Sequence, residues 1–340
     1  MSVFNQAYIF IRKSDKTISI FNLDRGILYN NLDSNLNSLY SKNIITGDLS
    51  FADTWFDIDS NDNIYGIINN KEGKLINVNI KSNNIDSNTF FKYDYERFFI
   101  KFPLVKDVFG EIHVIYYLID KNKFNSSRLF HIYKYNGVYK KNTIDSINYN
   151  ILTNFVITWD NNIPTIFYFK LVNGCEEIFT STFDLINLEW SAPFKITNSR
   201  KPKIYLSIIK SHDDKYHITY SEDNNKRYYC KYLTIVSENN KFKTYNSACL
   251  STNIMCLFPS LIECNLTLYI QWVEYYNLYT CKSTDGGNTW SKPHISKYFS
   301  FLPIYIYEFK SNFSDDCIYN LSSLFSFENC FDVDKMLPKY

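Results

Sequence analysis

The sequence lacks a long hydrophobic run, an excess of charge of either sign and the features that open a secretory leader. Its longest apolar run, Ile112–Ile119, has about eight residues, whereas a membrane-spanning helix needs about 20. The 36 basic and 35 acidic residues leave a net charge of +1, which gives no general attraction for nucleic acid or an anionic membrane. Residues 1–12 contain no basic stretch followed by an apolar core, so no signal peptide is expected. We therefore expect a cytoplasmic protein, or one delivered to a surface or coat by a non-classical route.

Motifs for metals, cofactors and common nucleophiles are also missing. The eight cysteines lack the CxxC pairs and histidine spacing of a zinc site, so no metal is expected. G-x-G-x-x-G, P-loop and G-x-S-x-G sequences are absent, so no cofactor is expected. Cys230 and Cys281 lie in strand-like runs, which is typical of small buried thiols in a reducing compartment.

Aromatic residues and asparagine are abundant instead. The 29 tyrosines and 28 phenylalanines supply most of the 18% aromatic content, and 40 asparagines contrast with only 9 glycines and 8 prolines. Aromatic side chains suit the half-buried surface of a sheet, and asparagine suits turns, including turns that need a positive φ. Apolar residues alternate with a period of two, and no sustained helical period is present. The sequence therefore predicts an all-β protein.

A unit of two apolar strands joined by a polar turn recurs along the whole chain. Seven equivalent points in this unit are separated by 46 to 52 residues: Ile18, Ile64, Ile112, Pro164, Tyr216, Thr267 and Ile318. A third strand is predicted at residues 74–80, 128–135, 176–183 and 227–233. A repeat of about 50 residues with about four strands is typical of a β-propeller blade. We predict a single β-propeller domain over residues 1–340 with four-stranded antiparallel blades. Seven blades are favoured, with six as the alternative if the first and last units share one blade.

One short segment carries a sharper motif. Residues 283–290 read Ser-Thr-Asp-Gly-Gly-Asn-Thr-Trp, and residues 183–190 form a related segment without the glycine; both segments end in tryptophan and are followed by Ser-x-Pro. The first segment resembles the Asp-box of the sialidase-like (BNR repeat) β-propeller superfamily. The resemblance implies a structural motif away from the active site. In it Ser283 and Asp285 would hold a turn, Gly287 would supply a positive φ and Trp290 would pack between blades.

Similarity to sialidases also implies a set of catalytic residues. That family uses three arginines around a sugar carboxylate, a tyrosine nucleophile with a glutamate partner, and an aspartate acid/base; a guanidinium binds a carboxylate in bidentate fashion. Residues of these types in loops at one end of the predicted propeller are Arg97, Arg200, Arg227, Asp53, Glu274 and Tyr275. The first arginine of the family lies in an F/Y-R-I-P motif. The nearest match here, Phe10-Ile-Arg12-Lys, displaces the arginine and lacks the proline.

A non-catalytic binding module is the function favoured by the sequence. Sugars bind flat aromatic faces, and the loop residues Tyr275, Tyr276 and Phe299 could supply them for a glycan or a protein ligand. An exo-sialidase or related glycoside hydrolase is the alternative, and a structural or assembly scaffold, for example of a bacterial coat, is a further one. No nucleic-acid partner is expected, and the oligomeric state is open.

Overall fold

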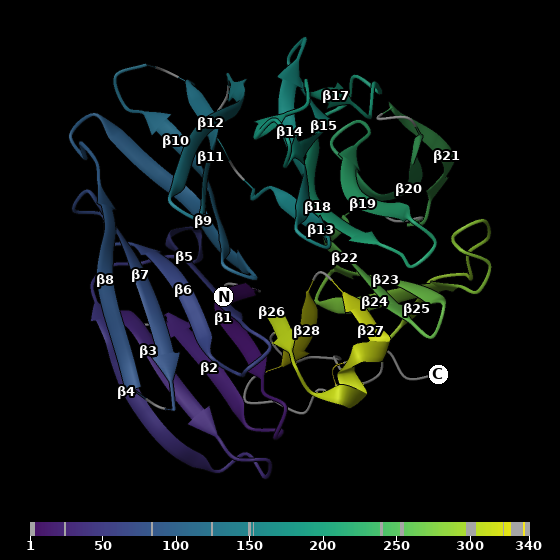
Figure 1. Cartoon of the computed structure of the whole chain (residues 1–340). Coiled ribbons are helices and arrows are strands. Elements are labelled where there is room, and N and C mark those ends of the chain that lie inside the picture. The colour runs from purple at the N-terminus through teal and green to yellow at the C-terminus, as the bar shows by residue number, and fades with distance from the viewer. Residues whose placement is uncertain are drawn as a thin grey trace.

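Six sheets arranged around a common centre make up the protein. The computed structural model describes residues 4–23, 25–82, 84–123, 125–148, 151, 153–238, 241–251, 255–296, 304–321, 323–327 and 336. Figure 1 shows the sheets following one another around the centre in chain order, with the last strands returning to the first sheet. The all-β propeller prediction is thus confirmed. No helix in the described residues is long and apolar enough to span a membrane.

The prediction of seven blades is wrong, because the described strands of the seventh repeat join the sheets of two other blades. Its first strand, β26 (Ile304–Ser311), pairs in parallel with β1 (Phe4–Arg12) of the first sheet. Its second strand, β27 (Tyr319–Leu321), pairs instead with β22 (Leu257–Cys264) of the sixth sheet. The described residues of this repeat contain no complete second hairpin with which to build a blade. Its strands therefore extend the inner edges of two neighbouring blades, whose backbone groups would otherwise be unpaired.

The first three blades are built from sequential antiparallel strands. Blade 1 is β2 (Ile18–Leu23), β3 (Gly26–Leu32) and β4 (Ser38–Thr46) outside β1, with β26 and β28 (Leu324–Phe327) inside it. Blade 2 follows the short 3₁₀ helix η1 (Phe51–Asp53) and is β5 (Thr54–Ile58), β6 (Ile64–Asn69), β7 (Lys74–Lys81) and β8 (Asn84–Lys92). Blade 3 is β9 (Phe98–Val108), β10 (Glu111–Asp120), β11 (Ser127–Tyr135) and β12 (Val138–Ile147).

The last three blades follow the same plan. Blade 4 is β13 (Val156–Asp160), β14 (Ile163–Val172) and β15 (Cys175–Asp184), with the short β16 (Glu189–Trp190) and β17 (Phe194–Lys195) both paired to β15. Blade 5 is β18 (Lys203–Lys210), β19 (Lys215–Asp223), β20 (Tyr228–Glu238) and β21 (Lys241–Cys249). Blade 6 is β22, β23 (Thr267–Glu274), β24 (Asn277–Ser283) and β25 (His294–Ile295), with β27 on the inside; the 3₁₀ helix η3 (Ser314–Ile318) precedes β27.

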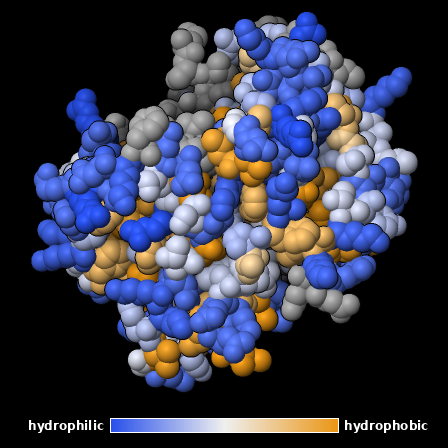
Figure 2. Space-filling model, turned by 90° about the horizontal axis from the view of Figure 1, so that it is seen from above, coloured by the Kyte–Doolittle hydropathy of each residue, from blue (hydrophilic) through white to orange (hydrophobic). Residues whose placement is uncertain are grey.

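Burial along the strands follows their distance from the centre. Every residue of β6 is buried, because this strand has neighbours in its own sheet and sheets on both faces, whereas most of β8 at the outer edge is exposed. Adjacent blades meet through apolar side chains, such as the stacked rings of Phe21 and Phe56, whose centroids are 3.9 Å apart. On the face drawn in Figure 2, hydrophobic residues form small groups with hydrophilic residues between them. The core therefore lies between the sheets.

Two tryptophans pack between neighbouring blades. Trp190 of blade 4 packs on His131 of blade 3, with ring centroids 5.4 Å apart, and Trp290 of blade 6 packs on Tyr232 of blade 5, at 4.8 Å. In the hairpin before Trp290, Asp285 accepts hydrogen bonds from the amide and hydroxyl of Thr289. These bonds lower the pKa of Asp285 to about 2.

Candidate functional site

A cavity of about 870 Å³ occupies the centre of the propeller. All six blades contribute to its walls, through β5, β9, β13, β18, β22 and β26, which we call the inner strands, and through β27 beside β22. Ligand sites of propellers and other folds are concave, largely apolar and fitted with a few polar groups, and this central cavity has that character. We therefore take it as the candidate site.

Five aromatic side chains, one from each of blades 2 to 6, line the cavity near the point where each inner strand begins. They are Phe51, Phe102, Phe155, Tyr205 and Phe258, and they recur at intervals of 50 to 53 residues. We call this set the aromatic collar. Phe102 and Phe155 are buried, at 8% and 3% exposed, whereas the side chains of the other three are part-exposed. The ring centroids of Tyr205 and Phe258 lie 4.1 Å apart, so these two side chains form a continuous aromatic surface.

Three collar residues stand at irregularities in the inner strands. Phe102, Tyr205 and Phe258 have φ values of 52°, 58° and 52°, in the left-handed region that bulky side chains rarely adopt. The strand register shifts beside each of them, as expected for a β-bulge. A backbone of this kind costs on the order of 1–3 kcal/mol per residue and is concentrated at functional sites, where it aims a side chain. The bulges direct three aromatic side chains toward the cavity.

Charged groups line the cavity farther along the inner strands. Lys106 Nζ on β9 donates to Asp57 Oδ2 on β5 at 2.8 Å. Lys310 Nζ on β26 lies 4.9 Å from the ring centroid of Trp55. Glu308 Oε2 is buried and has no hydrogen-bond partner within the described part of the chain. Burial raises the pKa of Glu308 to about 7; the positive charge of Lys310 opposes this rise and the negative charge of Asp57 adds to it.

A second cavity, of about 490 Å³, lies at the far ends of the inner strands of blades 4 to 6. It shares Trp159, Lys210 and Asn320 with the central cavity. Its polar groups are already engaged with one another: His212 Nδ1 lies 3.1 Å from Glu263 Oε1, and Lys210 Nζ lies 2.8 Å from Asp160 Oδ2. This cavity therefore offers a ligand fewer free groups than the central one.

The three arginines predicted for a sialidase site lie apart from both cavities. Arg97, between β8 and β9, pairs with Asp120 at 3.6 Å and its side chain is 52% exposed. Arg200, between β17 and β18, and Arg227, between β19 and β20, are both exposed. Among the described residues that line the two cavities there is no arginine. Arg12, the nearest match to the first arginine of the sialidase motif, pairs with Asp316 at 3.2 Å.

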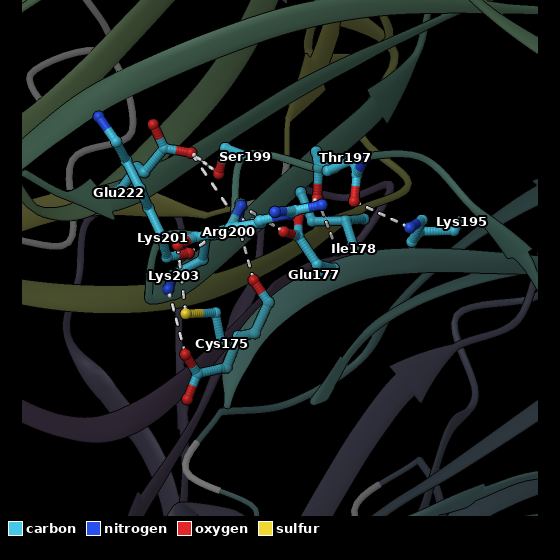
Figure 3. Close-up of polar contacts among 12 residues, drawn as sticks. Cys175, Glu177, Ile178, Lys195, Thr197, Ser199, Arg200, Lys201, Lys203 and Glu222 are labelled. Carbon is cyan, nitrogen blue, oxygen red and sulfur yellow. Dashed lines mark hydrogen bonds and ion pairs between the residues drawn. The ribbon is translucent and has the colours of Figure 1, made fainter. Parts of the chain in front are cut away.

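Arg200 instead borders a buried cluster of ionised residues between blades 4 and 5 (Figure 3). Its backbone N–H donates to Glu177 Oε1 at 2.8 Å. The Lys203 ammonium is fully buried and lies 2.9 Å from Glu177 and 3.7 Å from Glu222. Burial alone would raise the pKa of Glu177, but hydrogen bonds from Thr197, Lys203 and Arg200 outweigh it and lower the pKa. The polar groups of the cluster form their hydrogen bonds and ion pairs with one another, which indicates a structural role.

The two predicted carboxylates occupy the collar end of the propeller but are both buried. Asp53 is 1% exposed; it accepts hydrogen bonds from the amide and hydroxyl of Ser50 and lies 3.2 Å from Lys71 Nζ. Glu274 is also 1% exposed and ends β23, just before the hairpin turn of blade 6. Asp53 and Glu274 thus belong to blades 2 and 6, and neither lines the central cavity.

Tyr275 and Tyr276 form the turn between β23 and β24. Their φ values of 46° and 65° and the pairing of Glu274 with Asn277 indicate a two-residue type I′ turn. They are 57% and 60% exposed. Because Val273 pairs with Leu257, this turn is at the same end of blade 6 as the collar residue Phe258. Phe299, the third predicted binding residue, lies outside the described residues.

The segment predicted to be structural makes a closed turn. Gly287 N–H donates to Ser283 Oγ at 2.8 Å, Ser283 Oγ donates to Asp285 Oδ1 at 2.7 Å, and Trp290 Nε1 donates to the Gly287 carbonyl at 3.2 Å. Gly287 has a φ of 86°. The described residues contain no group of three or more histidine, cysteine or acidic side chains placed to bind a metal ion.

Sequence reasoning missed the aromatic collar and Glu308. The collar carries a signal that the sequence could have provided, because its five members share the period of the repeat itself. Glu308 carries no such signal. It lies in β26, which the sequence assigns to a separate seventh blade rather than to the inner wall of the first.

Comparison with known proteins identifies the fold. No family model matches the sequence, and no curated protein matches it. Among solved structures, a PL25 ulvan lyase bound to -[GlcA(1-4)Rha3S]- is similar over 98% of this chain and 97% of its own, with a TM-score of 0.64 and 9% identity. The GH93 α-L-arabinofuranosidase of Fusarium graminearum, in complex with arabinobiose, is similar over 84% and 94%, with a TM-score of 0.52 and 10% identity.

The WD40 domain of SCAP from fission yeast is similar over 95% of this chain and 82% of its own, with a TM-score of 0.51 and 8% identity. At such low identities the similarity shows a shared architecture alone. The structural neighbours of this β-propeller thus include carbohydrate-active proteins.

Proposed function

We propose that the protein is a glycan-binding β-propeller that holds a carbohydrate chain against the aromatic collar at the central cavity. The observation that carries this proposal is the collar itself, five aromatic residues from five successive blades lining one cavity. Aromatic faces pack against the apolar faces of sugar rings, and a few polar groups fix the orientation of a ligand.

The collar has the accessibility and polarity that a sugar requires. Tyr205 and Phe258 present adjacent, part-exposed rings, and the hydroxyl of Tyr205 hydrogen-bonds to no group in the described parts of the chain. This hydroxyl is therefore available to a sugar hydroxyl. Tyr275 and Tyr276 extend the aromatic surface outward along blade 6 at the same end.

The fold comparisons favour the same class of ligand. The ulvan lyase and the arabinofuranosidase are both named for action on carbohydrates, and both structures hold a saccharide. The name of the similar SCAP domain mentions no carbohydrate, and a fold does not fix a function, so the argument depends on the collar. Binding without cleavage is favoured over a sialidase activity, since no arginine occurs among the described residues lining the central cavity.

A glycan array containing matched sialylated and asialo ligands tests the proposal. Array hits are then measured by calorimetry with the Tyr205→Ala/Phe258→Ala double variant, and we expect an affinity loss of about tenfold or more from two lost stacking contacts. Tyr245→Ala, which removes an exposed ring from the outer strand β21, is the matched control and should bind like the wild type. Wild-type affinity in a folded double variant, or an array without hits, would overturn the proposal.

A further inference from the structure

Two charged residues on β26 face the central cavity and have no ion-pair partner among the described residues. Glu308 and Lys310 are two positions apart, so they lie on the same side of the strand, and both line the cavity. Neither side chain forms a hydrogen bond or an ion pair with any described residue. Buried and part-buried charged groups are normally paired, so these two are available for a ligand.

The other lysines that line the cavity have ion-pair partners. Lys106 is neutralised by Asp57 at 2.8 Å, and Lys210 is neutralised by Asp160 and by Asp214 at 2.8 and 2.9 Å. Within the described part of the chain Lys310 contacts the face of Trp55 at 4.9 Å and no acidic group, and an aromatic face holds an ammonium group in place without cancelling its charge. The free charge on the cavity wall is thus positive and belongs to Lys310.

Glu308 complements this charge as a hydrogen-bond donor. Burial raises its pKa to about 7, while Lys310 on its own strand lowers it and Asp57 on β5, which is paired with Lys106 on β9, raises it. Below that pH the carboxyl group is protonated and offers an O–H. A neutral Glu308 beside a free ammonium makes a site with two donors and a net positive charge.

We propose that the central cavity binds the carboxylate of an acidic sugar, with Lys310 as its ion partner and the O–H of Glu308 as its second donor. This inference rests on the proposed glycan-binding function and specifies the class of sugar. The aromatic collar would hold the apolar face of the ring, and the two residues of β26 would select the uronate group.

The test compares four uronate oligosaccharides (galacturonate, glucuronate, mannuronate and guluronate trimers) with their methyl esters, by calorimetry on the full chain at pH 6. The ester keeps the sugar and removes the charge. We expect the acid form of at least one trimer to bind tenfold or more tightly than its ester. If neutral glycans bind but every acid form is no tighter than its ester, this inference fails and the proposed function stands. If no glycan of any kind binds, both fail.

Two variants of Lys310 test whether its ammonium group causes the preference for the acid form over the ester. Lys310→Met should lower the affinity for the acid form about tenfold and leave the affinity for the ester unchanged, whereas Lys310→Arg should retain binding. Lys241→Met, on the exposed outer strand β21, is the matched control for loss of one positive charge. Equal loss of acid and ester binding in a folded Lys310→Met variant would contradict the role of the ammonium.

The role of Glu308 is tested by the pH dependence of the affinity for the acid form. Uronates are ionised throughout the range from pH 6 to 8, so a weaker binding of the acid form at pH 8 reports the loss of the Glu308 proton. Glu308→Gln keeps a donor at both pH values and should remove this dependence. A wild-type affinity that is constant from pH 6 to 8, or a dependence that persists in Glu308→Gln, would overturn the role of this residue.

Discussion

The indole N–H of Trp190 donates to Nδ1 of His131 across the interface between blades 4 and 3, at 3.0 Å. An indole nitrogen is only a donor, so His131 Nδ1 must accept and its proton must be on Nε2. That nitrogen lies 3.1 Å from His113 Nδ1, which accepts in turn. The bond from one tryptophan thus assigns the tautomers of two buried neutral histidines.

These histidines make the fold sensitive to mild acid. Burial lowers the pKa of His113 to about 4 and the pKa of His131 well below its ordinary value. The unfolded chain takes up these protons below about pH 6.5, so His113 lowers the free energy of unfolding by about 1.4 kcal/mol per pH unit between about pH 6.5 and 4, and His131 acts in the same direction. At pH 7 we expect His113→Gln to have a lower free energy of unfolding than the wild type. As the pH falls through this range, urea unfolding should show the two free energies converging. Parallel curves for the two proteins would contradict this assignment.

Two adjacent glycines give a matched pair for the turn before Trp290. A Cβ on Gly287 would lie 1.9 Å from Tyr232 Oη, whereas a Cβ on Gly286 would meet nothing within 4 Å. Both have a positive φ, 86° and 69°, so each alanine carries a backbone penalty of roughly 1–2 kcal/mol. We expect Gly287→Ala to be less stable than Gly286→Ala by a further 1–3 kcal/mol or so, because the blade interface must move apart. Equal unfolding free energies for the two variants in urea would rule out the close contact with blade 5.

The buried cluster between blades 4 and 5 depends on its single fully buried ammonium. Lys203→Met leaves Glu177 and Glu222 without that charge and should destabilise the fold by about 3–5 kcal/mol. Adding Glu177→Gln to Lys203→Met should recover part of the loss, since it removes one of the uncompensated carboxylates. A double-mutant cycle measured by chemical unfolding gives the coupling, and additive effects of the two changes would show that the ion pair is not the source of the stability.

Glu308 should destabilise the fold at neutral and alkaline pH. Its raised pKa means that the folded protein retains a proton that the unfolded chain has lost, so its contribution to stability is present below about pH 4.5 and disappears as the pH rises through about 7. Glu308→Gln removes this dependence and should be more stable than the wild type by about 1–3 kcal/mol at pH 8, with a smaller difference at pH 5. Thermal melts at the two pH values check the sign, and a larger gain at pH 5 than at pH 8 would contradict it.

The sequence predicts the repeat better than it predicts how the repeat closes. The third strands predicted at 74–80, 128–135, 176–183 and 227–233 correspond to β7, β11, β15 and β20, since alternating apolar residues flanked by turns determine a strand locally. The partner of residues 304–311 is not determined locally. Whether that strand starts a seventh sheet or joins β1 depends on which inner edges are open, and this is a property of the assembled ring.

The same distinction applies to the site. The collar residues were within reach of sequence analysis, because a phenylalanine or tyrosine recurs near the start of each inner strand at the repeat period. Their positive φ values at Phe102, Tyr205 and Phe258 were not, because large aromatic residues are poor predictors of a bulge. The contact of Lys310 with Trp55 depends on ring closure, which joins residues some 250 positions apart.

A double substitution in the turn at Tyr275 and Tyr276 should raise stability and weaken ligand binding. Both tyrosines have a positive φ, a conformation that Asn-Gly adopts with less strain, and Asn173-Gly174 occupies the corresponding turn of blade 4 with φ values of 52° and 83°. Tyr275→Asn/Tyr276→Gly should therefore raise the free energy of unfolding, by about 1 kcal/mol. If the two rings extend the glycan surface, the same change should weaken binding of glycans longer than the collar spans and leave short ones unaffected. Calorimetry with a ligand length series measures this, and equal affinity at every length would restrict the binding surface to the collar.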